Sequence, residues 1–173
     1  MALANCLASG KGKKTAVLEL ENENCFRWLA DEKKAIRRND AFRYQKIDFY
    51  FGTGRRNPAA MFNMDYDALI FDLGKNVSEY REMFLTSDRK LVLCVLQKWK
   101  RKEAEIMLER FQNPVWGYLT PDFYTISSSD DERKKFERRS GVTVKQLPWI
   151  PDPFHLTVNL LPVLSDILGN GPY

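Results

Sequence analysis

Short runs of apolar residues recur along the chain and are separated by stretches long enough for a helix. Three runs are almost wholly apolar: Thr15–Leu20, Ala68–Phe71 and Leu91–Leu96. Apolar runs of this length are typical of parallel strands that are buried on both faces of a sheet. We therefore expect all three to be inner strands of a mainly parallel sheet.

The remaining segments fit between these strands. The aromatic-rich segment Ile47–Phe51 is expected to be extended, and 118–127 and 142–147 are expected to be a fourth and a fifth strand. Helices are expected over Ala2–Ser9, around Cys25–Leu29, over Ser78–Leu85, around Trp99–Phe111, over Asp130–Arg139 and over Leu156–Leu168. Ser78 is expected to cap the start of its helix, and Gly10 and Gly141 are expected to end theirs. Pro162 is expected to kink the last helix.

Strands that alternate with helices predict an α/β fold with three layers, in which helices flank a mainly parallel sheet. We expect the whole chain, residues 1–173, to form a single domain. Functional sites in such folds lie outside the carboxyl ends of the strands. The chemistry is therefore sought at the residues that follow each run, such as 19–21, 72–76, 127–129 and 147–152.

Composition adds little constraint. The chain has 44% hydrophobic and 29% charged residues and a net charge of +4, which is ordinary for a globular protein. The three cysteines have no metal-like spacing, and we find neither an export signal nor an apolar run of about 18 residues. These features predict a cytoplasmic protein, peripheral to a membrane at most.

The segment Gly10-Lys11-Gly12-Lys13-Lys14-Thr15 resembles a P-loop only superficially. A P-loop follows a strand and begins a helix, so that the amide groups at the helix start point at phosphate. Here a helix precedes the segment and a strand follows it, and position 7 is leucine where the first glycine should stand. We interpret the segment as a solvated basic turn.

The segment Tyr66–Gly74 is a better candidate for a site. It is an apolar strand that ends in Asp72, and a carboxylate delivered to a sheet edge can hold the water shell of Mg²⁺. An aspartate after a strand is also often a simple turn cap.

Together these segments resemble the ParA/MinD class of P-loop ATPases, including its divergent members linked to pilus assembly and septum placement. Residues 2–20 are similar to the family's first helix and second strand, and Tyr66–Gly74 is similar to its Walker B strand. Leu91–Leu96 resembles the next strand, and 146–152 resembles the proline segment that borders adenine. The resemblance implies a P-loop NTPase-like fold that is incomplete or degenerate.

The resemblance also implies roles for individual residues. Asp72 matches the Walker B acid and metal ligand, and Gly74 matches the residue that approaches the terminal phosphate. The other positions implied to bind cofactor are Ser127, Pro148 and Pro151, together with Glu19 and Glu21, which stand where the family has aspartates.

The family's Walker A loop is not found in this sequence. The resemblance therefore implies a catalytically inactive chain that acts in localisation or partner binding, and ATP with Mg²⁺ only if a phosphate-binding loop precedes Met1. Two alternatives stay open: a truncated reading of an active partition ATPase, and a receiver-like signalling domain with its phosphoacceptor in Tyr66–Leu73.

In the family the missing strand lies between the Walker B strand and the strand matching Leu91–Leu96. We expect that slot to be closed or to be filled, for instance by Ile47–Phe51, because open strand edges promote aggregation. A partner chain that donates a strand is the third option. We also expect self-association.

Weak, non-specific contact with DNA or an acidic membrane is expected at one basic cluster that surrounds Trp99. Its members are Lys98, Lys100, Arg101 and Lys102. The single histidine, His155, has no nearby nucleophile in the sequence and is expected to cap or pack rather than to act as a base.

Overall fold

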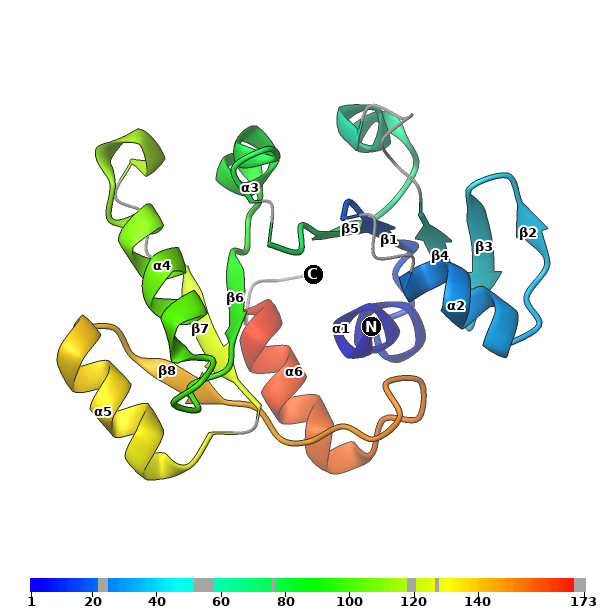
Figure 1. Cartoon of the computed structure of the whole chain (residues 1–173). Coiled ribbons are helices and arrows are strands. Elements are labelled where there is room, and N and C mark those ends of the chain that lie inside the picture. The colour runs from blue at the N-terminus through cyan, green and yellow to red at the C-terminus, as the bar shows by residue number, and fades with distance from the viewer. Residues whose placement is uncertain (22–24, 52–57, 76, 118–120, 127, 170–173) are drawn as a thin grey trace. The chain divides into compact units, whose positions relative to one another are not determined.

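The computed structural model describes residues 1–21, 25–51, 58–75, 77–117, 121–126 and 128–169 (Figure 1). The chain divides into two compact units. The first comprises Met1–Phe84 together with Ile150–Tyr173, and the second comprises Leu85–Trp149. The expectation of a single domain stays a prediction.

The first unit is built on a five-stranded sheet with the order β2-β3-β4-β1-β5. The strands β4, β1 and β5 are parallel, as the apolar runs predict, while β2, β3 and β4 form an antiparallel meander at one side. The bounds are β1 Thr15–Glu19, β2 Arg37–Arg38, β3 Ala41–Tyr44, β4 Ile47–Tyr50 and β5 Ala68–Asp72.

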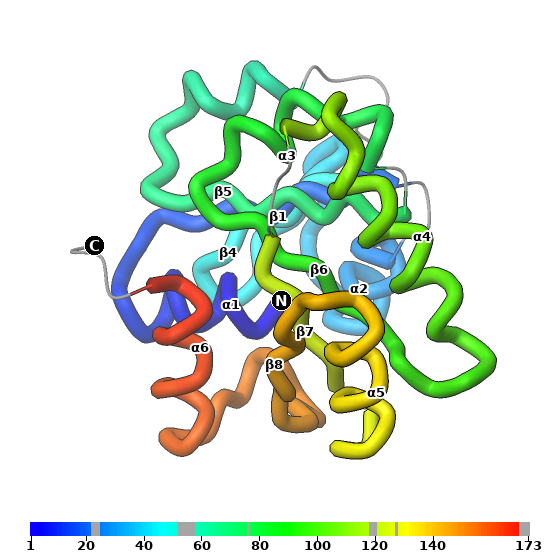
Figure 2. The backbone as a smooth tube through the Cα atoms, turned by 90° about the vertical axis from the view of Figure 1, so that its left-hand side faces the viewer, coloured from blue at the N-terminus to red at the C-terminus, as the bar shows by residue number. Residues whose placement is uncertain are grey.

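Helices and short turns cover both faces of this sheet. The last helix returns from far along the sequence to lie beside the first (Figures 1 and 2). The helices are α1 Ala2–Asn5, α2 Cys25–Glu32, α3 Arg81–Thr86 and α6 Leu161–Leu168, with 3-10 turns at Pro58–Asn63 and Val158–Leu160. Helix α1 continues as a π-helical turn over Cys6–Gly10. Helix α3 extends past Phe84 into the second unit.

Two helix predictions need correction. The helix expected from Ser78 begins at Arg81, after a turn over 77–80, and the helix expected from Leu156 begins at Leu161. Pro162 therefore lies in the first turn of α6 and causes no kink. Proline is favoured there because the first amide groups of a helix have no partner inside it.

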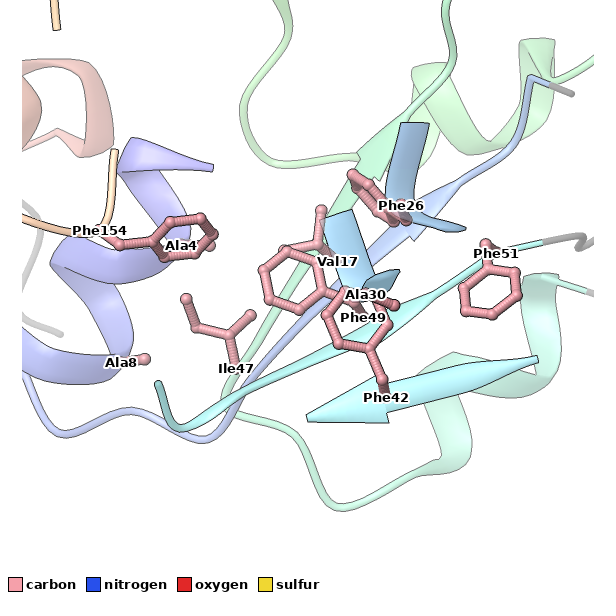
Figure 3. Close-up of a cluster of buried hydrophobic side chains, with 10 residues drawn as sticks. All are labelled: Ala4, Ala8, Val17, Phe26, Ala30, Phe42, Ile47, Phe49, Phe51 and Phe154. Atoms are coloured by element: carbon pink, nitrogen blue, oxygen red, sulfur yellow. The ribbon is translucent and has the colours of Figure 1, made fainter. Parts of the chain in front are cut away.

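The core of the first unit lies on both faces of β1, and Figure 3 shows the cluster on the face that carries Val17. One face packs against α1 and α2 through an aromatic cluster in which Phe49 is fully buried. The Phe49 ring stacks on Phe42 with 4.9 Å between ring centroids and meets Phe26 edge-on with 5.2 Å between centroids. On the other face Leu18 packs with Met61 and the partly buried Met83. This arrangement is the three-layer α/β structure that the sequence predicts.

The second unit has a parallel three-stranded sheet with the order β6-β7-β8. Ser129 and Glu132 form a capping box at the start of α5, and Phe136 is its one buried residue, as its sequence predicts. The elements are β6 Leu91–Cys94, α4 Arg101–Phe111, a 3-10 turn Pro114–Trp116, β7 Asp122–Thr125, α5 Asp130–Ser140 and β8 Val144–Gln146.

The expectation of a closed or filled slot is wrong for the described residues. β5 ends one sheet and β6 ends the other, so of the three predicted inner strands only β1 is inner. Ile47–Phe51 does not fill the slot, because β4 pairs with the opposite side of β1. A tight turn at Gln45 and Lys46, both with positive φ, ties β4 to β3 and holds it there.

The aromatic cluster predicts a large loss of stability on truncation. Phe49→Ala should lower the free energy of unfolding by about 3–5 kcal/mol, because it opens a cavity beneath β1. Urea unfolding followed by circular dichroism measures this loss. Trp28→Ala, at a side chain that is 76% exposed on α2, is the matched control and should change stability by less than about 0.5 kcal/mol. Equal effects would contradict the assigned core.

Candidate functional site

Acidic residues gather where β1 and β5 end. The two strands run in register, with Glu19 opposite Asp72 at their carboxyl ends. The backbone amide of Leu20 donates to the Asp72 carbonyl at 2.9 Å, and the Tyr80 hydroxyl donates to the Leu20 carbonyl at 3.0 Å. These bonds hold the carboxyl ends of β1 and β5 beside each other, at the edge where we expect a functional site.

Glu19 has a structural task. It is 5% exposed, and its two carboxylate oxygens accept the backbone amides of Cys25 at 2.7 Å and Phe26 at 3.3 Å. Those amides open α2 and would otherwise lack partners inside the helix. Glu19 thus caps α2 from the strand, and its predicted contact with a cofactor stays a prediction.

Asp72, Gly74 and Glu21 form a compact acidic turn. The exposed Asp72 carboxylate accepts the Gly74 amide at 3.2 Å, and Glu21 accepts the Lys75 amide at 3.0 Å. Gly74 has φ of +53°, and a Cβ at this position would lie 1.6 Å from a carboxylate oxygen of Glu21. The turn therefore places two carboxylates next to each other and depends on glycine to do so.

The start of α1 lies close to this turn. Burial lowers the pKa of the Met1 amino group, and the Asp72 carboxylate opposes that shift through its charge. Asp72 is therefore within electrostatic reach of the first residues of α1. Apart from the family resemblance, no pattern in the sequence indicates this proximity.

The acidic turn can contribute to a metal site only in part. Among the described residues no group of three or more histidine, cysteine or acidic side chains is close enough to hold a metal ion. Mg²⁺ commonly binds through one or two carboxylates with phosphate and water oxygens completing its shell. Asp72 and Glu21 fit that partial role, and the remaining ligands would come from a bound phosphate and water.

The other predicted nucleotide contacts lie in the later part of the chain. Ser127 lies outside the described residues, while its neighbour Ser128 accepts the Leu96 amide at 3.1 Å and bonds Thr125 at 2.8 Å. Pro148 and Pro151 are exposed and belong to different units. Their contact with adenine stays a prediction.

The predicted basic cluster lies just before and at the start of α4. Lys98, Lys100 and Lys102 are exposed beside Trp99, which is 77% exposed. Arg101 forms an ion pair with Glu105, with 3.2 Å between Nε and Oε1. Three lysines therefore remain available for a polyanion, and binding at this cluster stays a prediction.

His155 pairs with an acidic side chain close to it in the sequence. Its Nδ1 lies 2.6 Å from Asp152 Oδ2, and the pair is exposed in the turn before α6. The bond to His155 is the main cause of a lowered pKa at the Asp152 carboxyl, with the amide of Phe154 adding to it. The expectation that His155 caps or packs stays a prediction.

Asn5 is a polar residue that the sequence reasoning missed. It is 4% exposed within α1, and its Nδ2 donates to the Pro153 carbonyl at 3.1 Å, while its Oδ1 has no hydrogen-bond partner among the described residues. With Ser9, Gln45 and His155 it lines a depression of about 450 Å³. A buried asparagine within the apolar run Ala2–Ala8 is the only sequence signal that could have drawn attention to it.

The acidic turn predicts an unusual cost for a small substitution. Gly74→Ala should lower the free energy of unfolding by about 2 kcal/mol or more, since the positive φ is strained and Cβ collides with Glu21. Gly141→Ala is the matched control, because Gly141 also has positive φ but faces open space, and it should cost about 1 kcal/mol. Chemical unfolding of both variants measures the difference, and equal costs would argue against the close packing of Glu21 on the turn.

Comparisons with known proteins identify the fold. No family model matches the sequence, and no curated protein does either. A plasmid partition protein of Borrelia burgdorferi, solved with AMPPNP bound, matches with a TM-score of 0.61 at 13% identity, covering 96% of this chain and 88% of that one.

A plasmid partition protein from Borrelia burgdorferi, solved at 2.25 Å resolution, matches with a TM-score of 0.57 at 10% identity and the same coverage. At such low identity the likeness concerns the fold alone. The chain therefore has an α/β fold of the kind found in ParA-like partition proteins, as the sequence resemblance predicts.

Proposed function

We propose that this chain is a ParA-like module that works in localisation or partner binding, and that its own residues do not hydrolyse ATP. The observation that carries the proposal is the likeness of fold to plasmid partition proteins across 96% of the chain. One of those proteins was solved with AMPPNP, which makes ATP the nucleotide to test.

The position of Asp72 supports a nucleotide-related ancestry. It follows a parallel strand at the carboxyl edge of the sheet and lies near the start of α1. In P-loop proteins an acid in this setting assists Mg²⁺ while amides at a helix start hold phosphate. Asp72, with Glu21 beside it, is therefore our candidate for the metal ligand.

The basic turn argues against phosphate chemistry by these residues alone. Lys11–Lys14 precedes β1 and so lies at the amino end of the strand, opposite the edge that carries Asp72. Lys14 also has acidic partners. Its ammonium group pairs with Asp65, and its backbone amide donates to the Asp67 carboxylate at 2.8 Å. No other segment of this sequence has the order and spacing of a P-loop.

The receiver-like alternative is less well supported. The structural likeness is to plasmid partition proteins, and the sheet that holds Asp72 carries an antiparallel meander, β2-β3-β4, on the side away from β5. A truncated reading of an active partition ATPase agrees with the same fold as well as the inactive module does. Binding of ATP and Mg²⁺ would then depend on a phosphate-binding loop supplied from outside these residues.

We further propose a cytoplasmic protein that associates with itself or with a protein partner. None of the helices in the described ranges is long and apolar enough to cross a membrane. The apolar strands β5 and β6 each lie at the end of a sheet, where unpaired backbone groups can accept another strand.

The first test of the proposal is ATP hydrolysis. Purified protein should release phosphate at the background rate and bind ATP with Mg²⁺ weakly, because phosphate affinity in this class comes mainly from the loop amides and lysine. A phosphate-release assay and calorimetry measure the two quantities, with Asp72→Asn as the matched variant. Submicromolar affinity, or turnover that Asp72→Asn abolishes, would contradict inactivity.

A second test concerns self-association. The sedimentation coefficient should rise with protein concentration, because the edge of β5 offers an apolar run, Ala68–Phe71, without proline or lysine to block pairing. Sedimentation velocity over a wide concentration range measures this. A single monomer boundary at every concentration would refute association through the edge.

A further inference from the structure

The segment that joins α2 to β3 concentrates positive charge and exposes an apolar side chain. It reads Lys33-Lys34-Ala35-Ile36-Arg37-Arg38, and we name it the 33–38 corner. Ile36 is 85% exposed, the most exposed large apolar side chain among the described residues. An aliphatic side chain this exposed among cations is accessible to a partner surface.

Two of the cations in the corner are uncommitted. Lys33 pairs with Glu32 at 3.0 Å, and Arg37 pairs with Asp31. Lys34 and Arg38 make no ion pair with any residue that the structure describes. Residues 25–46 hold seven basic and three acidic side chains, an excess equal to the whole net charge of +4.

Trp28 extends the same surface along α2. It is 76% exposed and lies three positions before Asp31, so both side chains are on one side of the helix. Because Arg37 reaches Asp31, the corner lies next to that side of α2. The exposed tryptophan thus lies on the side of α2 that Arg37 of the corner contacts.

We propose that Trp28 and the 33–38 corner dock on a lipid bilayer with anionic headgroups. Ile36 enters the boundary of the acyl chains, Trp28 lies at headgroup level, and Lys34 and Arg38 bind the headgroups. Aliphatic insertion beside cations is how interfacial segments bind membranes, and tryptophan favours the interface. A nucleic acid would use the cations but gains nothing from an aliphatic tip, which is why a bilayer is the occupant we favour.

This proposal gives the localisation in the proposed function a physical surface and does not depend on nucleotide chemistry. Binding should be weak and reversible, since the corner supplies one aliphatic side chain and two free cations. Each cation adds about fivefold near an acidic surface, and burial of the isoleucine adds about tenfold or more.

Vesicle flotation tests the proposal with the full chain and no nucleotide. The protein should float with vesicles of phosphatidylcholine and phosphatidylserine, remain behind with phosphatidylcholine alone, and be released by high salt. Ile36→Ser should reduce the bound fraction about tenfold, and Lys34→Glu with Arg38→Glu should abolish binding. Circular dichroism should show all variants folded, because these side chains are exposed.

Matched controls separate the corner from general charge and hydrophobicity. Val158→Ser removes a side chain that is 79% exposed, and Lys134→Glu with Arg138→Glu makes the same change of charge at exposed positions of α5. Both controls should bind vesicles like the original chain. Full binding by Ile36→Ser, or binding to duplex DNA but not to vesicles, would overturn the proposal; neither outcome bears on the ATP test.

Discussion

The burial of β1 between β4 and β5 is the interaction on which the first unit depends. Val17 faces the aromatic cluster under α1 and α2, while Leu18 faces the opposite layer. A strand covered on both faces cannot slip by one residue without exposing apolar side chains, so its register with β5 is fixed. That register is what brings Glu19 and Asp72 to the same edge.

The edge strands show a conflict between sequence and structure. β5 and β6 have the apolar composition of inner strands, yet each ends its sheet in the described residues. Natural proteins usually protect such edges with lysine, proline or a covering segment. An apolar edge can accept another strand, and this links the fold to the proposed self-association or partner binding.

Charge is distributed along β1 in a way that separates two functions. Its carboxyl end meets the acidic turn of Glu21 and Asp72, while its amino end follows Lys11–Lys14. A phosphate near the acidic turn would be repelled unless Mg²⁺ or helix amides compensated the charge. The cations Lys34 and Arg38 of the 33–38 corner lie instead on an exposed surface, away from the carboxyl ends of β1 and β5.

The sequence by itself determined the α/β class, the runs that became β1, β5 and β6, and the ends of α5, because apolar periodicity and caps are local properties. It also located Asp72 at a strand end. It could not determine that Ile47–Tyr50 joins β1 rather than filling the slot, since strand order depends on contacts between distant residues. Only the tertiary structure shows that Glu19 accepts the amides at the start of α2. Only the tertiary structure shows that Ile36 is exposed beside Lys34 and Arg38, because the burial of a side chain depends on what packs against it.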